Sequence, residues 1–126
     1  MGPPPTAPAP PPRREPTTEH ITGVAVEETS DGVMVAVKTS TGRAAARRAR
    51  LRDGDLNEAV VAAVASLMYA DPPRIVVVEE GKLDGCAVMS VLLEHIDGER
   101  KAGSAIVENG PAFAVARAVW AALTGS

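Results

Sequence analysis

Short runs of alternating apolar and polar residues, separated by glycine-containing turns, open the patterned part of the chain. Residues 21–28 and 33–39 predict two strands, and Val33, Val35 and Val37 fall on one face of the second. The turns between the strands are Ser30-Asp31-Gly32 and Ser40-Thr41-Gly42. Residues 43–51 are predicted to continue as a third strand, although alanine is a poor strand former.

A helical pattern follows these strands. Residues 56–69 predict a helix whose apolar side chains recur at helical spacing and form one stripe: Leu56, Val60, Ala63, Val64 and Leu67. Asp55 is a candidate N-cap, because a short side-chain acceptor before the first turn can bind its free N–H groups. Asp71-Pro72-Pro73 ends the helix, since proline cannot continue one.

The same order of elements then repeats. Residues 74–80, 86–96 and 100–107 predict three further strands, joined by a loop at 81–85 and a tight turn at Asp97-Gly98. Asn109-Gly110-Pro111 opens a final helix at 112–123, with proline in the first turn, where its missing N–H group has no cost. Its apolar stripe is Ala116, Val119, Trp120 and Leu123.

The two halves correspond turn by turn, and the residue offset between them drifts only from 53 to 56. The aligned turn residues are Asp31-Gly32 with Asp84-Gly85, Gly42 with Gly98, and Gly54 with Gly110. The two helix stripes also coincide. This pattern indicates an internal duplication. It predicts an α+β fold of two successive βββα units related by pseudo-two-fold symmetry, with the sheets covered by helices.

The strands of the second half carry apolar residues on both alternating faces. Cys86, Val88 and Leu92 fall on one face; the other carries Met89, Val91 and Leu93. A helix covers only one face of a three-stranded sheet. The second face must therefore be buried against the other unit or against another chain.

Residues 1–18 are rich in proline and almost free of large apolar side chains. We expect them to form a disordered tail, because they bury too little apolar surface to offset the entropy lost on ordering. Residues 19–126 are then the double βββα domain. Its core must be aliphatic, since the chain has one tyrosine, one phenylalanine and one tryptophan.

Charge and composition narrow the class of partner. The formal net charge of −3 argues against a general binder of nucleic acids or anionic membranes. No stretch approaches a membrane span or a signal peptide, so we expect a cytoplasmic protein without a membrane partner. The single cysteine, Cys86, is predicted to be a buried and inert strand residue.

The double βββα order and the Asn109-Gly110-Pro111 turn, followed by Ala114, resemble the C-terminal allosteric domain of the 2-isopropylmalate synthase and citramalate synthase family. The resemblance covers residues 21–123. It implies association with a second copy and binding of a feedback amino acid near the glycine-rich loop. Glu108 and Phe113 depart from the family pattern, which has a glycine and an acidic residue there. The resemblance does not extend to the family's catalytic barrel.

The sequence offers few groups for catalysis. His20 ends the tail, His95 is predicted as a solvent-facing strand residue, and neither has the spacing of a metal site, so we expect no metal and no cofactor. The acidic pairs Glu27-Glu28 and Glu79-Glu80 are predicted to protect strand ends. No arrangement of these groups indicates an enzyme.

Two candidate binding sites follow. The turn and first helical residues Asn109, Gly110, Pro111 and Ala112 provide free N–H groups that could bind a carboxylate or phosphate, or simply be capped. A basic patch of Arg43, Arg47, Arg48 and Arg50 could bind phosphate or an acidic partner, or be solvated.

The leading hypothesis from the sequence is a non-catalytic oligomerisation or regulatory module, a homodimer or a binder of a partner protein, with a small-molecule effector. The alternative is RNA binding through the arginine-rich strand. The lack of basic residues at the start of the last helix makes nucleic acid the less favoured partner.

Overall fold

The computed structural model describes residues 19–49, 55–68 and 70–125. The predicted tail at 1–18 lies outside this part, as do Arg50, Gly54 and the predicted helix end at Tyr69. The described chain folds as two three-stranded antiparallel sheets, each followed by a helix that packs against it. The predicted α+β architecture of two βββα units is therefore confirmed.

The first unit contains β1 (Ile21–Thr29), β2 (Gly32–Thr39) and β3 (Ala44–Ala49), followed by α1 (Asp55–Leu67). The strands pair in the order β1-β2-β3, and Val33, Val35 and Val37 are buried beneath α1 as predicted. Helix α1 begins at the predicted cap, Asp55, whose side chain lies outside the described part. β-branched valines favour β2, and the alanine-rich α1 packs closely on it.

The second unit contains β4 (Arg74–Leu83), β5 (Cys86–Glu94), β6 (Arg100–Ile106) and α2 (Pro111–Thr124). The predicted loop at 81–85 is wrong, because β4 continues through Leu83 and only Asp84 and Gly85 form the turn. Both turn residues have positive φ angles, 52° and 81°. Asp-Gly suits a two-residue hairpin turn of this kind, whose twist matches that of the flanking strands. Helix α2 begins with Pro111 in its first turn and ends at Gly125, whose backbone has a left-handed conformation.

The duplication extends to irregular details. The register of β1 against β2 shifts between Ile21 and Gly23, and that of β4 against β5 shifts between Ile75 and Val77. Each shift is 54 residues from the other. The turns after β2 and β5 are also alike: Gly42 and Gly98 both have φ of 88°. Bulges and turn geometry are specific features, so their repetition supports two copies of one ancestral unit.

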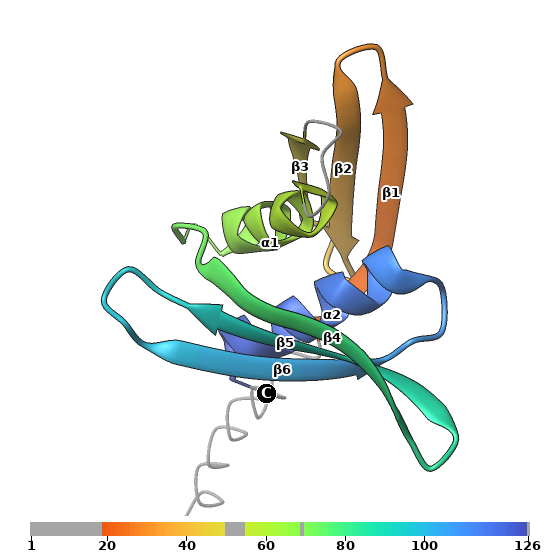
Figure 1. The fold of residues 1–126 in the computed structure, drawn as a ribbon. Coiled ribbons are helices and arrows are strands. Elements are labelled where there is room, and N and C mark those ends of the chain that lie inside the picture. Colours follow the sequence, from red (N-terminus) through yellow and green to blue (C-terminus); the bar gives the residue numbers. More distant parts are fainter. Residues whose placement is uncertain (1–18, 50–54, 69, 126) are drawn as a thin grey trace, which may run out of the picture.

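Both helices lie in the space between the two sheets (Figure 1), where they contact each other and share one core. Trp120 and Val119 of α2 and Val60 and Val64 of α1 belong to this core. Gly103 of β6 allows α2 to approach closely, since a Cβ atom there would clash with the Ala118 carbonyl and lie 2.6 Å from the Ala122 nitrogen. The opposite, outer faces of both sheets are left without a covering element in the described chain.

Candidate functional site

The outer face of the second sheet carries the main group of uncovered large apolar side chains. Val77 is 42% exposed, Ile106 48% and Leu83 69%. Val88 and Leu92, between them on β5, are half-buried. These five residues are called the outer patch below. In the same sheet, Met89, Val91 and Leu93 point inward and are buried, so the predicted two-faced apolar pattern is real and one face is open.

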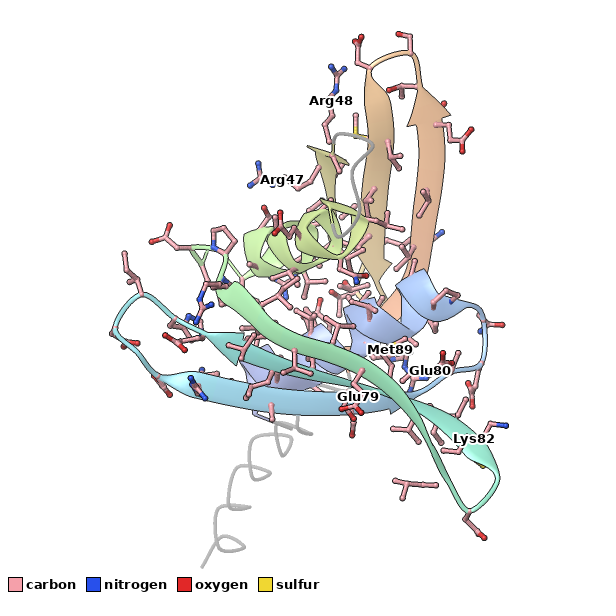
Figure 2. All side chains as sticks on the ribbon, in the orientation of Figure 1. Arg47, Arg48, Glu79, Glu80, Lys82 and Met89 are labelled. Carbon is pink, nitrogen blue, oxygen red and sulfur yellow. The ribbon has the colours of Figure 1, made fainter. Side chains whose placement is uncertain are left out.

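Polar groups lie at one end of the outer patch and across its middle. At one end Glu94 accepts from Arg74 at 3.2 Å and from Arg100 at 3.1 Å, which makes a three-residue ion network across the strands. Glu79 on β4 and Ser90 on β5 lie in the middle of the face. Glu79 and Met89 point to opposite sides of the sheet (Figure 2). Exposed apolar side chains interspersed with polar groups are common in protein interfaces.

The outer face of the first sheet differs in its side chains. A shallow hollow of about 380 Å³ lies there, lined mainly by small residues and by the stem of Lys38: Gly23, Val24, Ala25, Ala36, Val37, Lys38 and Ala44. Small side chains bury little apolar area per residue, so this face has a weaker hydrophobic drive for association than the outer patch.

The strongest polar cluster joins the two units. Glu19, just before β1, accepts from Arg43 at 2.6 Å and 2.9 Å and from Thr39 at 2.8 Å, and also from Thr41. Its backbone carbonyl accepts from the indole N–H of Trp120 on α2 at 3.2 Å. Hydrogen bonds from Arg43 and Thr41 hold the pKa of Glu19 at about 2, well below its usual 4.5. These contacts are internal, which indicates a structural role.

The described residues of the predicted basic patch do not form one surface. Arg43 binds Glu19, donates to the Leu67 carbonyl and lies 5.9 Å from the centre of the Trp120 ring. Arg47 is on the inner side of β3 and donates to Ser66 of α1 at 2.6 Å. Arg48 is on the outer side, and Arg50 lies outside the described residues (Figure 2).

The predicted ligand site at the start of α2 is exposed at Asn109, Gly110 and Pro111, while Ala112 is half-buried. Gly110 is the N-cap with φ of 96°, and no side chain caps the helix. The first turn has no acidic residue. Glu108 instead lies 3.8 Å from Arg117, whose guanidinium is 5.8 Å from the centre of the Phe113 ring. The four predicted residues are thus neighbours in one exposed turn.

Two predictions about single residues are wrong. Cys86 is exposed rather than buried, because it lies on the outer face of β5, opposite to the face that α2 covers. His95 is half-buried rather than solvent-facing, and its Nε2 atom is buried without a hydrogen-bond partner. His20 is exposed, and the acidic pairs on β1 and β4 are exposed on their strands. Sequence reasoning missed Glu19, because its partners lie 20 to 101 residues away.

Within residues 19–49, 55–68 and 70–125, no group of three or more His, Cys, Asp or Glu side chains could hold a metal ion. No helix in this part of the chain is long and apolar enough to cross a membrane.

The chain matches no protein-family model, no curated protein and no solved structure. What can be assigned is therefore the small α+β fold with two βββα units.

Proposed function

We propose that this protein is a non-catalytic association module that forms a homodimer through the second sheet. The observation that carries the proposal is the outer patch: Val77, Leu83 and Ile106 leave 42% to 69% of their surface in water on one continuous sheet face. Burying such side chains is favourable by about 25 cal/mol per Å² of apolar area. A second copy supplies an apolar face of the same size in the same compartment.

The size of the chain supports this proposal. Among the described residues each sheet is followed by one helix, and both helices pack on the inner faces. No other element of the described residues covers the outer patch, and association with a second copy would remove it from water. The exposed thiol of Cys86 suits a reducing compartment, so we retain the cytoplasm as the proposed location.

The resemblance to the 2-isopropylmalate synthase allosteric domain agrees with association as a function, because that domain pairs with a second copy. The proposal stops short of a feedback effector. The uncapped start of α2 offers N–H groups, but every helix start offers such groups. RNA binding has less support, since Arg43 and Arg47 are engaged by Glu19 and Ser66 inside the domain.

Sedimentation velocity of the full chain over a wide concentration range tests the proposal. We expect a reversible shift from monomer to dimer as concentration rises. A chain that remains monomeric up to about 300 µM would exclude homodimerisation as the function, because weaker association is not specific at cellular concentrations. A parallel thermal-shift screen with amino acids and nucleotides tests whether any effector stabilises the fold.

A further inference from the structure

We infer that two copies pack the outer faces of their second sheets together about a two-fold axis that runs across the strands through the row Glu79, Ser90 and Ser104. This inference rests on the proposed homodimer and adds its geometry. It comes from the register of the three strands, which fixes which outer side chains share a row.

Three rows define the middle of the face. The central row is Glu79, Ser90 and Ser104 on β4, β5 and β6. On one side lies the row Val77, Leu92 and Ala102, and on the other the row Gly81, Val88 and Ile106. Large residues of one row therefore stand at the strand positions where the other row has small ones: Val77 against Gly81, and Ile106 against Ala102.

An axis across the strands places each flanking row over the partner's other flanking row. Val77 then faces the partner's Gly81, Leu92 faces the partner's Val88, and Ile106 faces the partner's Ala102. Large side chains opposite small ones interdigitate without voids in packed sheets about 10 Å apart. An axis along β5 would give a similar match of sizes, so size alone does not choose between the two axes.

The positions of the charged side chains distinguish the two possible axes. An axis along β5 would place Arg74 against the partner's Arg100 and Glu94 against the partner's Glu94, which juxtaposes two ion networks of the same net sign. The axis across the strands instead places Arg74 against the partner's Leu83, the most exposed residue of the outer patch. The aliphatic stem of Arg74 can cover Leu83 while its guanidinium stays in water. One like-charge contact remains, between the two Glu79 side chains on the outer strands.

The available area predicts a weak dimer. Three strands about 4.8 Å apart and about nine residues long, at about 3.3 Å per residue, give a face of about 14 Å by 30 Å. Interfaces below about 600 Å² per partner belong to transient complexes. We therefore expect a dissociation constant in the range of about 10 to 100 µM.

Cysteine cross-linking tests the geometry on the full chain. Ser90 lies on the axis, so the double variant Ser90→Cys, Cys86→Ser should form a covalent dimer with a short bis-maleimide. The native Cys86 should not, because four residues on each side of the axis separate the two thiols by about 26 Å. The matched control Ala36→Cys, Cys86→Ser places a thiol on the outer face of the first sheet and should remain monomeric in denaturing gels.

A charged substitution in the outer patch provides a second test of the interface. Ile106→Glu should weaken the dimer by at least about tenfold, because it buries an unpaired carboxylate. Val26→Glu, at a position of nearly equal exposure on the first sheet, should change affinity by about twofold or less. Circular dichroism checks that both variants fold. The cross-linking test with Ser90→Cys does not require either charged variant.

The outcomes separate this inference from the proposed function. A dimer that cross-links through native Cys86 overturns the axis. A dimer that does not cross-link at residue 90 and resists Ile106→Glu overturns the face. Either result leaves homodimerisation standing. Open-ended oligomers, as expected if the outer patch fills the hollow beside Ala36, overturn the two-fold geometry. A monomer at all concentrations overturns both proposals.

Discussion

Arg43 donates two hydrogen bonds to the carboxylate of Glu19, from Nη2 to Oε1 at 2.6 Å and from Nε to Oε2 at 2.9 Å. The pair is part of a network in which the buried Thr39 hydroxyl donates to Oε2. Arg43 also reaches the last carbonyl of α1, and Glu19 reaches Trp120 of α2. One ion pair thus ties the strand entry of the first unit to both helices.

Glu19→Gln should destabilise the domain by about 1 to 3 kcal/mol, because it removes the charge that Arg43 and two hydroxyl groups face. The measurement is urea denaturation at neutral pH. Glu58→Gln, an exposed glutamate on α1, is the control and should change stability by less than about 0.5 kcal/mol. Equal effects of the two substitutions would show that the Glu19 network contributes nothing.

Acid should weaken the same network. The pKa of Glu19 is about 2 in the folded chain against 4.5 for the free group, so folding favours the ionised carboxylate. The contribution of the ionised Glu19 carboxylate to folding stability is complete above about pH 4.5 and is lost as pH falls toward 2. With Arg43 40% exposed and screened by water, we expect a loss of about 1 to 2 kcal/mol.

Denaturation curves at pH 7, 4.5 and 3 give this loss for the wild type and for Glu19→Gln. The variant should lose less stability than the wild type over the acid range, by the amount assigned to Glu19. Parallel pH profiles for the two proteins would assign the acid sensitivity to other carboxylates.

Gly103→Ala should cost about 2 to 3 kcal/mol. Its Cβ atom would clash with the Ala118 carbonyl and come within 3.0 Å of the Ala122 Cβ atom, so α2 must move away from β6. Gly81→Ala, in the same sheet with no atom within 4 Å of a new Cβ, is the matched control. Thermal unfolding at low protein concentration, where monomer dominates, checks both. A small effect at residue 103 would mean that α2 does not approach β6 as closely as the structure shows.

Glu79→Gln should tighten the proposed dimer by about two- to fivefold, because it removes the one like-charge contact across the inferred axis. Sedimentation at fixed salt measures the change. Glu28→Gln, an exposed glutamate on the first sheet, should leave the affinity unchanged. Weaker association of the Glu79 variant would instead favour the axis along β5, in which Glu79 accepts a hydrogen bond from the partner's Ser104.

Periodicity and turn chemistry predicted the order of all eight elements, because alternation in Val33 to Val37 and the helical stripe around Val60 are local signals. The end of β4 was misplaced because Gly81 looked like a turn residue, whereas cross-strand pairing with Val88 keeps it in the ladder. Tertiary pairing outweighed local propensity there.

The candidate site was only partly predictable. The alternation of apolar residues at Val88 and Leu92 correctly identified a second apolar face. Which of the two faces α2 covers depends on the path from β6 into α2. The exposure of Cys86 follows from the same choice, because Cys86 lies on the open face with Val88 and Leu92. Glu19 and Arg43 meet only because the hairpin β1–β2 returns the chain, and no local signal records that meeting.

The hydrogen bond from Trp120 to the Glu19 carbonyl has a consequence for the connectivity of the fold. It brings the beginning of the first repeat beside the last helix, and Gly125 is only about 8 Å further along that helix. A short linker could therefore join the two termini of the domain, and a new opening at the exposed Asp71-Pro72 junction would give a circular permutant with the repeats in reverse order. The two repeats would then give the same three-dimensional arrangement in either order along the chain.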